Sequence, residues 1–280
     1  MLFIGDIAGA FEDRHLLTEE DVSPGPWRNN VFRGCVADHD FHDNLAPVSV
    51  EPSAGPSLRG SHRLQLWHRC PQAWAYRYVL GLDTKPTRAL AVGSLVHAAL
   101  MEHYLGHDPI AAMRAAPDDL VIYFEDALKL FVAYRNHYKN DRLNVIGVEQ
   151  EFVIRAGPYF HTQRFDLLIR DELGRVWIWD HKTGGRSDWE HSLQFLSAAM
   201  IGRAYFGDKF GGLTINQVSE LRRFSIYPPE AMIRQVARTI LTTNDQIERE
   251  LAANTDPYAY HRTYACQDRF GKCPYLDLCV

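Results

Sequence analysis

The stretch "RVWIWDHKTGG", Arg175 to Gly185, joins a very hydrophobic segment to a group of polar side chains. Its valine, isoleucine and two tryptophans predict a buried strand. The strand then ends in Asp180, His181 and Lys182, so an acid and a base stand two residues apart. Because successive side chains of a strand point to opposite faces, Asp180 and Lys182 should point the same way.

The preceding segment, "YFHTQRFDLLIR" at residues 159–170, predicts a second strand, and the turn sequence "DELG" joins the two. A hairpin centred on this turn sets Asp166 opposite Asp180. Opposed side chains have Cβ atoms about 4.5–5.5 Å apart, so the two aspartates should be neighbours. A shift of one residue in the pairing would separate them, and the interpretation therefore depends on this register.

Two neighbouring carboxylates repel each other unless a cation lies between them. Mg²⁺ and Mn²⁺ are hard ions that prefer oxygen ligands, so a divalent metal site at Asp166 and Asp180 would explain the arrangement. Lys182 would then orient a water molecule or stabilise charge on a phosphate. The alternative is a surface ion pair of Asp180 with Lys182, the ordinary interpretation of an isolated D-x-K.

The rest of the chain alternates helical and strand patterns. Helices are expected at residues 62–82, 88–105 and 118–138, at 187–207 with Ser187 or Asp188 as cap, and at 229–254; further strands are expected at 147–156 and 221–229. This order predicts an α/β fold with a central mixed β-sheet flanked by helices.

Composition limits the classes of protein to which the chain can belong. With 46% apolar and 12% aromatic residues it can bury a core, and it has no apolar run long enough for a membrane span. The first residues lack the pattern of a secretory signal, so a cytoplasmic location is expected. Residues 1–60 predict an arm or appendage of unknown role, and residues 61–280 a single domain. The net charge of −5 still permits a locally basic groove.

Five cysteines, an odd number without a secretion signal, argue against a disulfide framework. Cys266, Cys273 and Cys279 lie within the last fifteen residues, at spacings wider than those of most structural zinc sites. These cysteines could still bind zinc, could bind a different metal centre, or could be small buried hydrophobic residues.

These motifs together resemble the RecB-like branch of the PD-(D/E)XK nuclease superfamily, over residues 61–280. "GSLVH", ending at His97, resembles the G-x-x-x-H helix of that branch; "RFD" and "DHKTG" resemble its second motif and its D-x-K-T motif; "QFLSA" resembles its Q-x-x-x-Y helix. There are two departures, because Gln163 stands where the family has Gly and Ala198 where it has Tyr.

The resemblance implies a restriction-endonuclease-like core that hydrolyses DNA phosphodiester bonds with Mg²⁺ or Mn²⁺. The implied metal ligands are His97, Asp166 and Asp180, and Lys182 and Gln194 complete the catalytic set with the two aspartates. Glu149 and Glu151, on the neighbouring strand, could add a carboxylate, although exposed strand charges are commoner.

The spacing of the cysteines resembles the iron–sulfur subset of the same branch, the CRISPR-associated and AddB-type exonucleases. The resemblance implies a [4Fe–4S] cluster that joins the two ends of the domain. Its ligands would be Cys70, Cys266, Cys273 and Cys279, with Cys35 left over. Zinc is the alternative metal.

Basic and aromatic residues are interspersed between residues 62 and 88, as a single-strand groove requires. Arg69, Arg77 and Arg88 are the expected phosphate contacts, and the aromatic side chains fit a helix core better. The resemblance implies an exonuclease on single-stranded DNA or DNA ends, in recombination, repair, phage replication or CRISPR adaptation. Because the chain has no P-loop, a helicase would have to be a partner. A catalytically inactive DNA-binding module and a zinc-stapled interaction protein are the other two possibilities.

Overall fold

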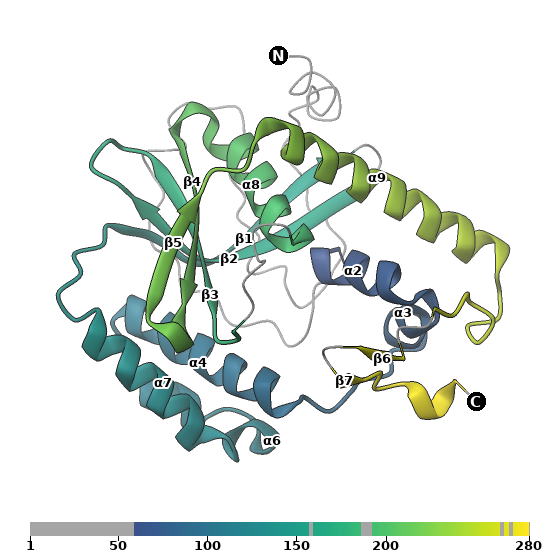
Figure 1. Ribbon diagram of the computed structural model, residues 1–280, viewed down its shortest axis with the longest axis horizontal. Coiled ribbons are helices and arrows are strands. Elements are labelled where there is room, and N and C mark those ends of the chain that lie inside the picture. Colours follow the sequence, from purple (N-terminus) through teal and green to yellow (C-terminus); the bar gives the residue numbers. More distant parts are fainter. Residues whose placement is uncertain (1–58, 157–158, 186–191, 264–265, 269–270, 280) are drawn as a thin grey trace.

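The computed structural model describes residues 59–156, 159–185, 192–263, 266–268 and 271–279. A five-stranded sheet with the order β1-β2-β3-β4-β5 lies at the centre (Figure 1). Its strands are β1 (Val145–Ala156), β2 (Tyr159–Arg170), β3 (Val176–Lys182), β4 (Phe210–Gln217) and β5 (Arg222–Ile226). Strands β3 and β4 are parallel and the other neighbours antiparallel, so the predicted mixed sheet is confirmed.

The hairpin of β2 and β3 has the register that the sequence predicts, with Leu167 opposite Trp179 and Ile169 opposite Trp177. Asp171 holds the turn, because its carboxylate accepts hydrogen bonds from the backbone of Arg175 at 2.8 Å and from the indole of Trp177 at 2.9 Å. The turn therefore fixes the pairing of the two strands that carry the aspartates.

Strand β4 was not expected from the sequence. Its segment, "FGGLTINQ", contains two glycines and alternates apolar and polar residues only over residues 213–216, although every residue in it is buried. The glycines make room for an aromatic ring, since a Cβ atom on Gly211 would lie 2.5 Å from the indole nitrogen of Trp177. Glycine in a strand often marks such a close approach, and it hides the strand from pattern analysis.

Helices cover both faces of the sheet (Figure 1). On one face α8 (Leu193–Phe206), α9 (Glu230–Ala253) and α2 (Ser61–Arg69) pack over the largest apolar cluster, which includes Leu168 and Ile178. On the other face α4 (Arg88–Leu105) packs through Met101 against Leu167 and Trp179. Helix α7 (Phe124–His137) packs against the outer side of α4. None of the helices in the described ranges has the length and apolar character needed to cross a membrane.

The helix at 88–105 is confirmed, whereas other helix predictions need correction. The expected helix at 62–82 divides at Pro71 into α2 and α3 (Pro71–Tyr78), and the one at 118–138 divides into α6 (Asp118–Val121) and α7. A short helix, α5 (Pro109–Arg114), was not expected. The predicted caps Ser187 and Asp188 lie outside the described residues; α8 begins at Leu193, capped by Ser192.

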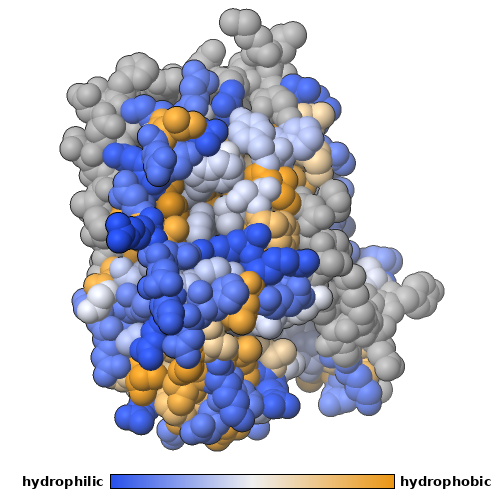
Figure 2. Space-filling view, turned by 60° about the vertical axis from the view of Figure 1, so that its left-hand side comes forward, coloured by the Kyte–Doolittle hydropathy of each residue, from blue (hydrophilic) through white to orange (hydrophobic). Residues whose placement is uncertain are grey.

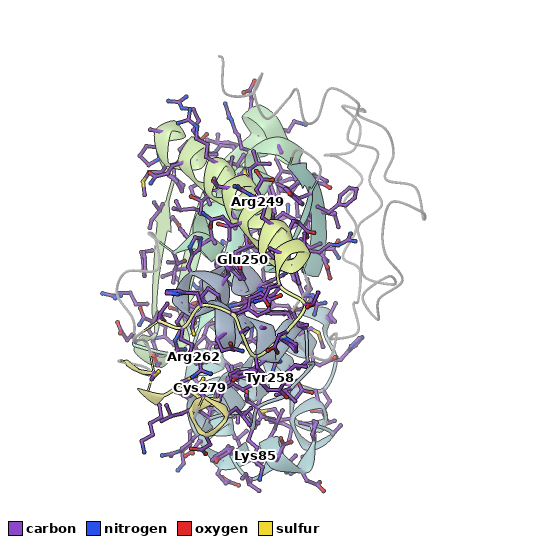
Figure 3. The ribbon with its side chains drawn as sticks, turned by 90° about the vertical axis from the view of Figure 1, so that its right-hand side faces the viewer. Lys85, Arg249, Glu250, Tyr258, Arg262 and Cys279 are labelled. Carbon is purple, nitrogen blue, oxygen red and sulfur yellow. The ribbon has the colours of Figure 1, made fainter. Side chains whose placement is uncertain are left out.

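The C-terminal segment returns to α3. It contains β6 (Gln267–Asp268), β7 (Gly271–Lys272) and the 3₁₀ turn η6 (Leu276–Leu278). The hydroxyl of Tyr76 donates to the carbonyl of Leu278 at 2.9 Å, and the hydroxyl of Tyr275 donates to the carbonyl of Leu82 at 2.9 Å. Figure 3 shows Arg262 and Cys279 close together below the end of α9, and the Arg262 guanidinium donates to the Cys279 carbonyl at 2.6 Å.

Candidate active site

A cavity of about 1120 Å³ lies between the sheet, α2, α3, α4 and the C-terminal segment. Its lining includes the predicted metal and catalytic residues, His97, Asp166, Asp180, Lys182 and Gln194, and all four cysteines of the predicted cluster. Figure 2 shows the face of the molecule on the side of β5 and α7. Hydrophilic side chains dominate this face, and apolar side chains gather mainly in its lower part.

Three side chains that line this cavity converge. Ligand atoms of His97, Glu149 and Asp166 all lie within 4.8 Å of one another, the only such group of three in the described ranges. Nδ1 of His97 lies 3.6 Å from Oδ2 of Asp166. Each residue comes from a different element, α4, β1 or β2, so only the folded chain brings them together.

Glu149 reaches this group through an unusual backbone conformation. The pairs Val148–Leu167 and Gln150–Phe165 flank it, so Glu149 stands opposite Asp166 in the register of β1 and β2. Its φ angle is 49°, in the left-handed region that non-glycine residues seldom adopt. Such strain persists only where the surrounding structure imposes it, and it is common at functional sites. The sequence carries no signal for this angle and left Glu149 and Glu151 undecided.

Burial and mutual repulsion act on the two acids of this group. Burial raises the pKa of Asp166, and the nearby His97 imidazole opposes that rise. Burial raises the pKa of Glu149 well above its usual value, and the Asp166 carboxylate raises it further. A divalent cation between two such groups would relieve both effects, and two carboxylates with one imidazole suit Mn²⁺ or Mg²⁺. The residues present therefore fit the metal that the sequence predicts.

Asp180, Lys182 and Gln194 form a second group beside the first. Lys182 Nζ lies 2.5 Å from Oδ2 of Asp180, and the Gln194 amide donates to Oδ1 of Asp180 at 3.3 Å. Lys182 also donates to the side-chain oxygen of Gln194 at 3.4 Å. The structure thus places Asp180 in contact with Lys182 and Gln194, and Glu149 with His97 and Asp166.

Both departures from the family motifs have a structural account. Gln163, at the position of the family glycine, donates from its side-chain amide to the backbone carbonyl of Gln194 at 2.8 Å and so braces the start of α8. Ala198 is buried in the core, with 4% of its surface exposed. Tyr205 does not substitute for a tyrosine there, because its hydroxyl donates to the Val153 carbonyl at 2.6 Å inside the core.

The family model of the PD-(D/E)XK nuclease superfamily matches residues 61–280. The chain belongs to this superfamily. No curated protein sequence matches it significantly. The match covers the sheet, the three-residue group and the C-terminal cysteines of this PD-(D/E)XK chain.

Two of the three arginines that the sequence predicts as phosphate contacts line the cavity of this superfamily member, and the third does not. Arg69 and Arg77 line the cavity, and Arg77 is 3.2 Å from Asp83. Arg88, at the start of α4, pairs with Asp126 at 2.7 Å and is not among the residues lining the cavity. His62, on α2, was not singled out from the sequence but lines the cavity; burial lowers its pKa, and Lys182 lowers it further.

All four cysteines of the predicted cluster line the same cavity. Cys70 is buried against Tyr76 and Tyr275, with Cys273 and Cys279 packed beside them. The backbone N–H of Cys273 donates to the carbonyl of Cys266 at 2.8 Å. Burial raises the pKa of the Cys273 thiol, and the nearby Cys279 and Cys70 raise it as well. None of these four described cysteines forms a disulfide; Cys35 lies outside the described residues.

Proposed function

We propose that this chain is a Mg²⁺- or Mn²⁺-dependent deoxyribonuclease that acts as an exonuclease on single-stranded DNA or DNA ends. The observation that carries the proposal is the convergence of His97, Glu149 and Asp166 beside Asp180 and Lys182, in one cavity of about 1120 Å³. Superfamily membership supports the chemistry, because nuclease activity is typical of the superfamily.

His97, Asp166 and Asp180 would hold the ion, with Glu149 as a further carboxylate. When bound, the ion would supply Lewis acidity to the phosphodiester. Lys182 has the position to stabilise the charge that develops on the phosphate, because its ammonium group is held by Asp180 and Gln194 at the rim of the same group. Gln194 orients both Asp180 and Lys182 and helps to place the strand.

The DNA strand would lie along the cavity. Arg69 and Arg77 line the same cavity as the acidic group and the cysteines, so two guanidinium groups are available for phosphates. Suitable biological settings are recombination, repair, phage replication or CRISPR adaptation, with a helicase or another recombination or adaptation protein as a partner.

The four cysteines would hold a [4Fe–4S] cluster that joins α3 to the C-terminal segment. All four line the same cavity, and Cys70 packs in one apolar cluster with Cys273 and Cys279, which supports this assignment. Cluster binding would then contribute to folding. Iron analysis and broad visible absorption test it; a colourless protein that contains zinc would contradict it. Cys70→Ser should lower the iron content.

The decisive test is a nuclease assay on end-labelled single- and double-stranded DNA. The wild type should degrade DNA with Mg²⁺ or Mn²⁺ and stop when EDTA is added. Asp180→Asn should lower the rate at least about 100-fold. Asp119→Asn changes an exposed acid of α6 and should leave the rate unchanged. A protein that binds Mn²⁺ and DNA but does not cleave would instead be the inactive DNA-binding module.

A further inference from the structure

The side chain of His181, between Asp180 and Lys182, is outside both groups of the candidate site. It is 2% exposed, and its Nδ1 lies 2.8 Å from the side-chain nitrogen of Asn216. Asn216 is its neighbour in the parallel pairing of β3 and β4 and is fully buried. Arg223 Nε donates to the oxygen of Asn216 at 3.4 Å, which fixes the amide orientation. The Asn216 nitrogen therefore donates, and Nδ1 of His181 accepts.

The main chain of His181 contacts the proposed ion ligands. Its backbone N–H donates to Oδ2 of Asp166 at 2.6 Å. Its carbonyl oxygen lies 2.9 Å from Nε2 of His97. Any rotation of the His181 backbone would thus change its contacts with both Asp166 and His97. The ring of His181 resists such a rotation because it is hydrogen-bonded to Asn216.

The bond to His181 belongs to a larger buried network. The Asn216 nitrogen also donates to the hydroxyl of Tyr134 on α7 at 2.7 Å. That hydroxyl lies 2.6 Å from the hydroxyl of Tyr104, and Arg223 donates to it at 2.9 Å. Tyr104 stands on α4 seven residues after His97, on the same side of the helix, and its ring is parallel to that of His181 at 6.0 Å.

Buried polar groups destabilise a protein unless they are hydrogen-bonded, so these bonds hold the Asn216 amide, the Tyr134 hydroxyl and Nδ1 of His181 in one arrangement, whereas Nε2 of His181 is buried without a partner among the described residues. This network connects α4, which carries His97, with β3 and β4. Its position behind the acidic group resembles the outer hydrogen-bond partners that orient metal ligands in general.

We propose that Asn216 is a positioning residue for the ion site. By holding the ring of His181, it fixes the peptide groups that orient Asp166 and His97 and so determines the affinity for the divalent ion. The inference rests on the proposed function, since it requires that these residues bind an ion.

The test is a titration of the purified chain with Mn²⁺, followed by calorimetry and without DNA. Asn216→Leu removes all three hydrogen bonds of the amide, to His181, Tyr134 and Arg223, at similar volume and should weaken Mn²⁺ binding about tenfold or more. Thr214→Val is the matched control. Thr214 lies two residues away on β4, is 3% exposed, and shares a hydrogen bond with Ser225 at 2.7 Å. The Thr214→Val variant should have a lower melting temperature than the wild type and the same Mn²⁺ affinity.

Tyr134→Phe provides a milder variant if Asn216→Leu folds poorly, and it should weaken Mn²⁺ binding by a smaller factor. In a His181→Phe background, Asn216→Leu should add little further loss, because both changes break the same hydrogen bond. Equal Mn²⁺ affinity in the folded Asn216→Leu variant and the wild type would overturn the inference. A wild type that binds no Mn²⁺ would instead overturn the proposed function.

Discussion

Gly93 and Thr183 are so close that a side chain on the glycine would touch the threonine: a Cβ atom on Gly93 would lie 3.1 Å from Oγ1 of Thr183. Gly93 belongs to α4, one turn before His97, and Thr183 directly follows β3. The missing side chain lets the helix approach the end of the strand, and this approach brings His97 to Asp166.

Gly93→Val should push α4 away from the end of β3. We expect a loss of about 1–3 kcal/mol in the free energy of unfolding, as overpacked sites commonly show, and weaker Mn²⁺ binding. Urea denaturation and calorimetry measure the two effects. Ala133→Val places the same β-branched residue at an exposed position of α7 and should leave Mn²⁺ binding intact. Normal Mn²⁺ affinity in Gly93→Val would contradict this account of the glycine.

Glu149→Gln should make the metal-free protein more stable and the metal-bound protein less so. The pKa of Glu149 is raised in the fold, so its ionisation destabilises the native state increasingly as pH rises above the usual carboxyl range. In EDTA at pH 8 the variant should melt at a higher temperature than the wild type, and the difference should shrink toward pH 5. Mn²⁺ should raise the melting temperature of the wild type more than that of the variant.

Glu151→Gln serves as the comparison for Glu149. Glu151 pairs with Arg164 at 3.2 Å and does not belong to the three-residue group. Its replacement should therefore leave the Mn²⁺-induced rise in melting temperature unchanged. A similar loss in both variants would show that charge in this region matters generally, and not the specific placement of Glu149.

Lys182→Met should separate ion binding from turnover. Removal of the ammonium group takes a positive charge away from the ion site, so Mn²⁺ affinity should stay equal or increase, while the cleavage rate falls about 100-fold or more. Calorimetry and the end-labelled DNA assay give the two values. Lys85→Met, an exposed change outside the cavity, should alter neither. Loss of Mn²⁺ binding in Lys182→Met would assign the lysine a structural role.

His161 should make the protein sensitive to acid. Burial lowers its pKa from 6.5 to about 4, and its Nε2 lies 3.3 Å from the hydroxyl of Ser61. Between these values the unfolded state binds the proton more tightly, so stability falls as pH falls from 6.5 toward 4, by up to about 3 kcal/mol from this group.

Urea denaturation at pH 7 and pH 4.5 measures this loss. His161→Gln should lose less stability over that interval than the wild type. His261→Gln, at an exposed histidine, should behave like the wild type. Equal losses in all three proteins would show that His161 does not cause the acid sensitivity.

Local sequence determined the elements that carry the aspartates and the histidine. The pairing of β2 with β3 was predictable because a short turn fixes the register of a hairpin, and Asp171 holds that turn. Helix α4 was predictable from its apolar spacing, with Thr87 as its cap and Gly106 at its end. Asp166, Asp180 and Lys182 thus lie on the strands that the sequence indicates.

Tertiary structure alone decided the remaining features. Strand β4 is buried by its neighbours although its two glycines obscure the strand pattern. A positive φ angle that no residue pattern encodes turns Glu149 toward Asp166. The hydrogen bond between His181 and Asn216 joins two neighbouring strands that α8 separates in the sequence. The spacing of apolar residues in the sequence indicates which face of its own helix or strand a residue occupies. Contacts between distant segments depend on how the elements pack, and that packing completes the site.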